Sequence, residues 1–103
     1  MTWHLHPTEL ALLRTLLTQH LPGYEVRLFG SRVVGWPGSR GVKPHSDVDL
    51  AVSGAPSDLA LAELRADLEE SDLPWRVDVC LLDALPPALR EQVRTHGAVL
   101  LPF

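Results

Sequence analysis

The sequence predicts a single small α/β or α+β domain, in which a short mixed β-sheet has its helices packed on one face. Three observations lead to this fold class. Leucines recur at the spacing of amphipathic helices in separate segments of the chain. Short apolar runs rich in valine alternate with these segments, and glycine- and proline-rich stretches separate them. No internal repeat or low-complexity segment divides the 103 residues, so we expect one domain spanning 1–103.

The first half of the chain is expected to contain a helix followed by two strands. Helically spaced leucines, with Pro22 shortly after them, predict an amphipathic helix over residues 8–20. A short strand is predicted at 26–29, where the apolar run stops at a glycine. Residues 35–44 are expected to form an irregular loop, and residues 47–52 a second strand.

The second half repeats this alternation of helix and strand. A helix is predicted over residues 57–70, with Ser57 as its N-terminal cap. The apolar run at 75–82 predicts a third strand. Paired prolines open a last helix at 86–97, because proline suits the first turn of a helix and glycine its end. Residues 98–103 are expected to form either a short strand or a packed tail.

The composition argues against two classes of function. Nine lysines and arginines against thirteen aspartates and glutamates give a net charge of −4. This is the wrong sign for neutralising a phosphate backbone, so we expect no direct nucleic-acid binding. Apolar runs fall far short of the ~20 residues of a membrane helix, and the first residues lack the features of a signal peptide. We therefore expect a cytoplasmic protein without membrane contact.

The stretch LFGSRVVGWPGSRGVKPHSDVDLAV carries a candidate metal site. Side chains alternate across a strand, so Asp47 and Asp49 point to one face and both carboxylates can bind one ion. Oxygen ligands without histidine or thiolate suit Mg²⁺ or Mn²⁺. Because Mg²⁺ is usually held by one or two carboxylates together with substrate phosphates, the pair also predicts a phosphate-bearing substrate.

Two further motifs fit this chemistry. Gly30-Ser31 ends a strand, where a residue without a side chain lets phosphate approach and the next hydroxyl and amides donate to it. Asp78 lies inside the apolar run WRVDVCLL and is a candidate third acid of a two-metal site, since an unpaired buried charge is costly. Each motif also has a simpler interpretation. Gly30-Ser31 and Ser46-Asp47 are typical of turns, and Asp78 could lie at an exposed position of an edge strand. The combination is far more specific than any one motif.

These residues resemble a known family. FGSR, SDVDLAV and, about thirty residues later, RVDVCLL are similar to the minimal nucleotidyltransferase (MNT) domain of the DNA polymerase β-like superfamily. The resemblance covers nearly the whole chain. It implies that Asp47, Asp49 and Asp78 are the catalytic and metal-binding residues. Asp78 is implied to bind the catalytic metal and to help activate the attacking hydroxyl.

The resemblance also implies the nucleotide contacts. Gly30 and Ser31 are expected to hold the triphosphate, with Arg32 beside them as a candidate phosphate contact. The loop that follows, 32–45, is several residues longer than in most family members, and Val34 stands where many relatives have an arginine. These departures leave the metal-binding acids intact but bear on nucleotide affinity.

Family members of this size typically pair with a HEPN-domain toxin, and some transfer AMP from ATP to a tyrosine of that toxin. The resemblance therefore implies an ATP-dependent protein adenylyltransferase that acts as the antitoxin of a HEPN/MNT pair. Two alternatives stay open. One is a catalytically inactive antitoxin that neutralises its toxin by binding alone. The other is a small-molecule nucleotidyltransferase of the aminoglycoside type, although those enzymes usually carry an additional helical domain.

Two more residues, Trp36 and Cys80, carry expectations of their own. Trp36 either packs within the fold or stacks on a base or a partner. Cys80 is the single cysteine, which excludes an internal disulfide, and we expect it to be an inert packing residue.

Overall fold

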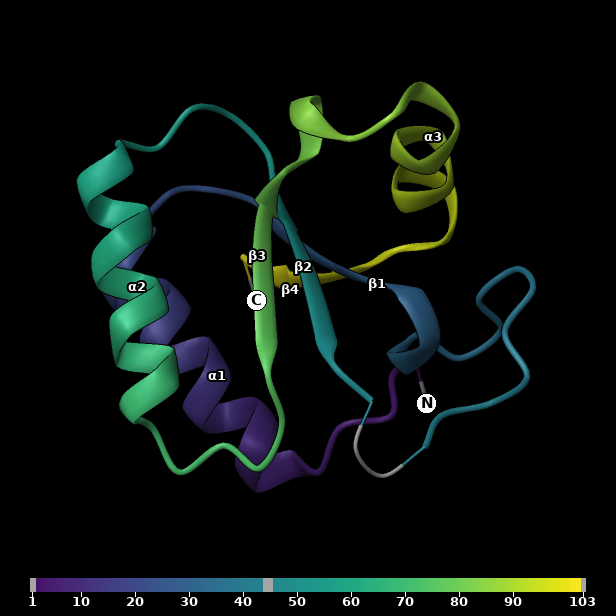
Figure 1. Ribbon diagram of the computed structural model, residues 1–103, viewed down its shortest axis with the longest axis horizontal. Coiled ribbons are helices and arrows are strands. Elements are labelled where there is room, and N and C mark those ends of the chain that lie inside the picture. Colours follow the sequence, from purple (N-terminus) through teal and green to yellow (C-terminus); the bar gives the residue numbers. More distant parts are fainter. Residues whose placement is uncertain (1, 44–45, 103) are drawn as a thin grey trace.

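The computed structural model describes residues 2–43 and 46–102. These residues fold into a mixed sheet flanked by helices (Figure 1). In chain order the elements are α1 (Pro7–His20), β1 (Val26–Phe29), the 3₁₀ turn η1 (Gly30–Arg32), β2 (Val48–Val52), α2 (Asp58–Glu70), β3 (Val77–Leu81), the 3₁₀ turn η2 (Leu82–Ala84), α3 (Pro87–His96) and β4 (Ala98–Leu101). The predicted α+β fold class with a mixed sheet is confirmed.

The sheet has the strand order β3-β2-β1-β4. β1 is antiparallel to both β2 and β4, whereas β2 and β3 are parallel. A parallel pair needs a long crossover, which α2 supplies between β2 and β3. The register places Asp49 opposite Phe29 on one side and opposite Asp78 on the other. The topology therefore brings together residues that are far apart in the sequence.

α1 and α2 cover one face of the sheet, as the leucine spacing predicts. The core contains Leu10, Leu13 and Leu17 from α1 together with leucines 61, 64 and 68 from α2. Ser57 caps α2 as predicted, because its hydroxyl oxygen accepts a hydrogen bond from the Ala60 amide at 3.1 Å. None of the described helices has the length and apolar character needed to span a membrane.

The position of α3 corrects the expectation that all helices pack on one face. Its buried residue Val93 packs with Ala51 and Leu82 in a second, smaller core. Ala51 alternates with the buried residues Leu50 and Val52, so its side chain lies on the face opposite α1 and α2. Figure 1 shows α3 on the other side of the sheet from those two helices. Asp49 lies on the same face as Ala51, which places the acids beside the region that α3 covers.

The strand limits differ slightly from the prediction. β2 begins at Val48 and leaves Asp47 just outside the strand. β3 is shorter than the predicted 75–82, because Trp75 turns into the main core before the strand starts. Residues 98–101 form a true strand, β4, paired with β1. Pro44 of the predicted loop and Phe103 of the predicted tail lie outside the described residues.

Candidate active site

The structure places the three predicted acids at one end of the sheet. Asp49 and Asp78 are register partners on the parallel strands β2 and β3, so their side chains lie on the same face. Asp49 is half-buried, and the Asp78 side chain is 44% exposed. Asp47 immediately precedes β2 and is exposed. Two of the acids are thus held by the sheet itself, and the third lies at its rim.

The acids influence one another electrostatically. Burial, reinforced first by the charge of Asp78 and then by that of Asp47, raises the pKa of Asp49 to about 6. Partial removal from water disfavours a carboxylate, and a second negative charge nearby disfavours it further. The arrangement therefore gathers negative charge that a cation would neutralise.

The donor set fits a hard divalent cation. It offers carboxylate oxygens, which Mg²⁺ and Mn²⁺ prefer. Within residues 2–43 and 46–102, no group of three or more aspartate, glutamate, histidine or cysteine side chains is gathered closely enough to hold a metal ion by itself. An open arrangement suits an ion that takes its remaining ligands from water and substrate phosphates. The Arg76 guanidinium donates to an Asp78 carboxylate oxygen at 3.0 Å, so Asp78 already has a positive partner.

Gly30 lies against Asp49 at the end of β1. Its φ of +82° is the left-handed conformation that glycine adopts readily. A Cβ atom at this position would lie 2.9 Å from Asp49 Oδ2, closer than such atoms normally approach. Ser31 follows in the η1 turn and is half-buried. The predicted Gly-Ser motif is therefore adjacent to the acids, and the roles predicted for both residues stay predictions.

Arg32, the residue expected beside the triphosphate, makes its contacts within the protein. Its side chain is buried, at 7% exposure, and burial lowers its pKa. Arg32 Nε and Nη2 donate to the Ser46 carbonyl at 3.2 and 2.8 Å, and Nη1 donates to the His4 carbonyl at 3.0 Å. The guanidinium also lies 5.4 Å from the centre of the Trp75 ring. Arg32 thus ties the η1 turn to the residue that precedes Asp47.

Sequence reasoning missed this role because the partners of Arg32 lie far away in the chain. Ser46 and His4 are 14 and 28 residues distant. Both accept through main-chain carbonyls, so no side-chain pattern signals the contact. A motif arginine beside Gly30-Ser31 looks the same in sequence whether it points toward the nucleotide or into the protein.

The contacts of Trp36 and Cys80 bear on the roles expected for them. The Trp36 ring lies 6.2 Å from the Phe29 ring and 6.5 Å from the His96 ring, which is the packing alternative. This contact anchors the long loop against β1 and the end of α3. Cys80 is half-buried, and its Sγ donates to the Leu50 carbonyl at 3.3 Å. Burial raises the pKa of the Cys80 thiol, which is the opposite of what activates a nucleophile.

Together, the mixed sheet, the glycine turn and the acids on adjacent strands define a nucleotidyltransferase domain. The family model described as "Polymerase beta, Nucleotidyltransferase" matches residues 16–102. The chain belongs to this family.

Several known proteins are similar to the chain. The probable protein adenylyltransferase MntA of Haemophilus influenzae is 44% identical over 94 residues, which cover 89% of this chain and 78% of MntA. A solved toxin–antitoxin structure with AMP-PNP matches with a TM-score of 0.64 and 28% identity over 96% of this chain and 75% of that one. The complex of tri-AMPylated Shewanella oneidensis HEPN toxin with MNT antitoxin matches with a TM-score of 0.62 and 26% identity, covering 93% and 71% of the two chains.

Proposed function

We propose that this chain is a metal-dependent protein adenylyltransferase that transfers AMP from ATP to a hydroxyl of a HEPN-domain partner and serves as the antitoxin of that pair. One observation carries the catalytic part: Asp49 and Asp78 stand in register on adjacent strands, with Gly30 against Asp49. The similarity to MntA and to the two toxin–antitoxin structures supports the acceptor and the partner.

Asp47, Asp49 and Asp78 are the residues that would hold Mg²⁺ or Mn²⁺. When bound, the cation would neutralise triphosphate charge and polarise the phosphoryl group. Gly30 leaves room for phosphate because it has no side chain, and the Ser31 hydroxyl supplies a donor next to it. Arg32 does not reach the nucleotide in this proposal. It positions the segment before Asp47 through its hydrogen bonds to the Ser46 carbonyl.

The reaction is a single displacement at phosphorus. The acceptor hydroxyl oxygen attacks the α-phosphorus of ATP, the bond from that phosphorus to the bridging oxygen breaks, and pyrophosphate leaves. The hydroxyl proton passes to the Asp78 carboxylate, which stands at the edge of the sheet and is partly exposed to solvent. The contact from Arg76 holds that carboxylate in place before substrate arrives.

A thermal melt tests the nucleotide site without a partner. Three carboxylates repel a triphosphate, so ATP with EDTA should have little effect. ATP with Mg²⁺ should raise the melting temperature, because a ligand at a hundred times its Kd adds about 2.7 kcal/mol to the folded state. For a domain near this size, the shift is on the order of 10 °C.

The Asp47→Asn/Asp49→Asn double variant should lose this shift. Asp72→Asn/Asp83→Asn is the matched control, because it removes the same charge from exposed residues elsewhere and should keep the shift. If ATP and Mg²⁺ together leave the wild-type melting temperature unchanged, the alternative of an antitoxin that acts by binding alone is favoured. Labelled ATP incubated with the chain and its HEPN partner then tests transfer directly.

A further inference from the structure

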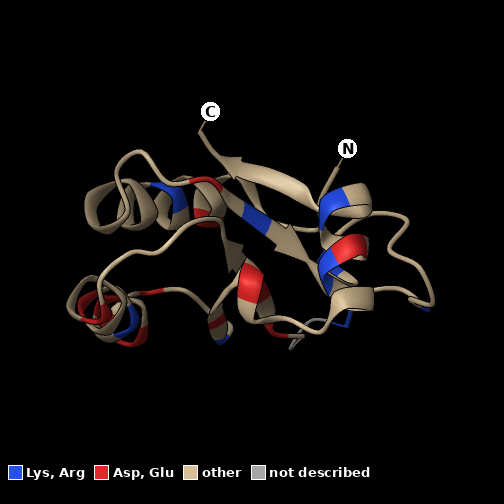
Figure 2. Cartoon of the chain, turned by 90° about the horizontal axis from the view of Figure 1, so that it is seen from above, with Lys and Arg blue, Asp and Glu red and all other residues tan. Residues whose placement is uncertain are grey.

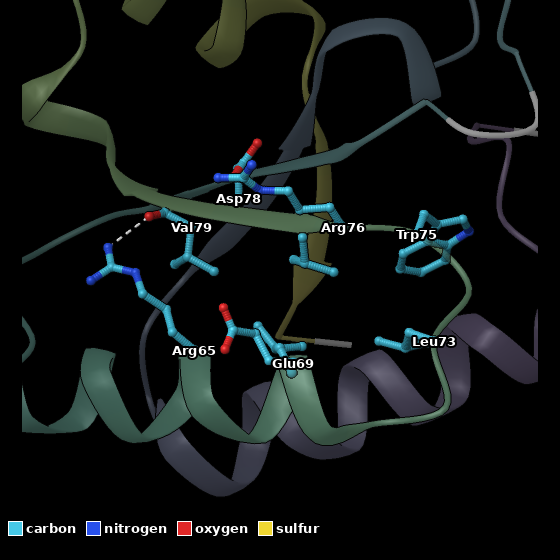
Figure 3. Close-up of a pocket in the computed structure, with 9 residues that line it drawn as sticks. Arg65, Glu69, Leu73, Trp75, Arg76, Asp78 and Val79 are labelled. Atoms are coloured by element: carbon cyan, nitrogen blue, oxygen red, sulfur yellow. Dashed lines mark hydrogen bonds and ion pairs between the residues drawn. The ribbon is translucent and has the colours of Figure 1, made fainter.

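A groove runs along the outer edge of β3, between that strand and α2 (Figure 3). Its volume is about 600 Å³, and Asp78 forms part of its wall. Arg65 and Glu69 border it from α2, while Leu73 and Arg76 border it near the start of β3. The groove thus lies on the α2 side of β3, the strand that carries one of the proposed catalytic acids.

β3 is an edge strand among the described residues, since the sheet order begins with it. The Val48 amide donates to the Arg76 carbonyl at 2.8 Å. Because alternate residues of a strand bond the neighbouring strand, the main-chain groups of Arg76 and Asp78 face β2. The main-chain groups of Val77 and Val79 therefore face outward, toward the groove. Arg65 Nη2 donates to the Val79 carbonyl at 2.8 Å, so one of these outward groups is already bonded.

The order of the site residues across the sheet gives the direction of attack. Gly30 follows β1, Asp49 lies on β2 and Asp78 lies on β3. In phosphoryl transfer, the attacking and leaving oxygens lie on opposite sides of the phosphorus. With the leaving pyrophosphate beside Gly30, the attacking hydroxyl comes from the β3 side, and the groove runs along the outer edge of that strand.

We infer that this groove receives an extended segment of the partner protein, the segment that carries the acceptor hydroxyl. The inference rests on the proposed function and adds the place where the acceptor binds. Figure 3 shows Asp78 on the opposite side of β3 from Arg65 and Glu69. The segment lies in the groove, and its acceptor side chain reaches over the strand edge to Asp78.

The lining defines the chemistry of the segment. Leu73 and Trp75 offer apolar contact near the start of β3, while Arg65, Glu69 and Arg76 offer charges of both signs. Because Arg65 occupies the Val79 carbonyl, the segment is held mainly by side-chain contacts rather than as an added strand. The Glu69 carboxylate points toward β3 in Figure 3 and would face a basic or hydrogen-donating group of the segment.

The test is the pair of variants Glu69→Arg and Glu70→Arg. Both residues are exposed, lie in the last turn of α2 and undergo the same charge reversal, but only Glu69 lines the groove. With labelled ATP and a HEPN-domain partner protein, Glu69→Arg should raise the KM for the partner at least about tenfold. Glu70→Arg should transfer like the wild type. Both variants should keep the wild-type melting shift with ATP and Mg²⁺, because neither touches the nucleotide site.

A second variant, Leu73→Ser, tests the apolar part of the groove and should also raise the KM for the partner. Equal transfer by Glu69→Arg and Glu70→Arg would overturn the inference alone. A wild-type protein that transfers no AMP would overturn the proposed function and the inference with it. A homodimer of the chain that Glu69→Arg dissociates would assign the groove to a second copy, which also overturns the inference.

Discussion

At the scale of single residues, Asp49 is the group that the fold perturbs most clearly. Its pKa rises from an ordinary 3.8 to about 6, with burial as the main cause and Asp78 and Asp47 as additional ones. The folded protein therefore binds a proton on Asp49 more tightly than the unfolded chain does. By linkage, the free energy of unfolding falls as the pH rises from about 4 to about 6. Above that range the ionised Asp49 carboxylate destabilises the folded protein to its full extent.

We predict that Asp49→Asn stabilises the metal-free protein at neutral pH. The variant removes a partly buried charge and its repulsion from two neighbours, a gain of about 1 kcal/mol once solvent screening is allowed for. The gain should shrink as the pH falls below about 6 and vanish once the pH lies well below the ordinary pKa of 3.8, because the wild-type carboxyl is then protonated in both states. Urea unfolding in EDTA across this range measures it. An unchanged difference at all pH values would contradict the electrostatic explanation.

Arg32 is the second residue whose role the fold defines. Its buried guanidinium bonds main-chain carbonyls on two separate segments, a geometry that the lysine ammonium cannot reproduce. Arg32→Lys should therefore destabilise the protein by about 2 kcal/mol, the scale of lost charge-assisted hydrogen bonds. Arg40→Lys, at an exposed loop position, is the control and should be neutral.

Denaturant unfolding without nucleotide separates the two possible roles of Arg32. A positioning role predicts loss of stability in the absence of ATP. Normal stability of Arg32→Lys, combined with loss of the melting shift by ATP and Mg²⁺, would instead restore the phosphate contact predicted from the sequence.

At the scale of elements, the junction between β1 and η1 is the critical turn. Gly30 combines a positive φ with close approach to the Asp49 carboxylate, so the turn sets how near the Gly30-Ser31 segment comes to the acids. The neighbouring long loop is fixed separately, by Trp36 against Phe29 and His96. Two different contacts therefore shape the connection between β1 and β2.

We predict that Gly30→Ala costs more stability than Gly38→Ala. Both glycines have positive φ, +82° and +78°, so each alanine introduces about 1 kcal/mol of backbone strain. Only at Gly30 would the new methyl group meet a neighbour, Asp49 Oδ2 at 2.9 Å, whereas nothing lies within 4 Å at Gly38. The difference in unfolding free energy isolates that contact. Gly30→Ala should also lose the rise in melting temperature with ATP and Mg²⁺. Equal losses of stability in the two variants would contradict the close approach of Gly30 to the Asp49 carboxylate.

At the scale of the whole molecule, the surface charge is uneven. The net charge is −4, and Figure 2 shows acidic positions concentrated on α2. This helix carries Asp58, Glu63, Asp67, Glu69 and Glu70, with Arg65 among them. Because α2 also borders the groove beside β3, the acidic surface and the inferred acceptor site lie on neighbouring parts of the molecule.

We predict a stable complex with a basic HEPN-domain protein, favoured by charge complementarity. Raising the salt concentration should slow association more than it speeds dissociation, since long-range steering is screened first. Co-expression and size exclusion chromatography at low salt test complex formation, and stopped-flow mixing at two salt concentrations tests the rates. Separate elution of the two proteins at low salt would contradict the prediction.

Much of the fold followed from local patterns in the sequence. Leucine spacing predicts α1 and α2, and valine-rich runs predict the strands. Both signals depend only on residues that are close together in the sequence. The motifs around Gly30, Asp47, Asp49 and Asp78 likewise indicate the family, whose model matches residues 16–102. Strand parity then places Asp49 and Asp78 on one face once the register is known.

The tertiary structure alone decided what depends on contacts between distant segments. α3 packs against Ala51 on the face opposite the leucine-covered side, and no local pattern encodes that choice. The burial that raises the pKa of Asp49 comes from the assembled sheet, and the partners of Arg32 are main-chain carbonyls 14 and 28 residues away. The groove beside Asp78 exists because β3 is an edge strand packed near α2. Sequence periodicity reports which side of an element is apolar, whereas pairing order, burial and long-range hydrogen bonds are set only when the elements pack.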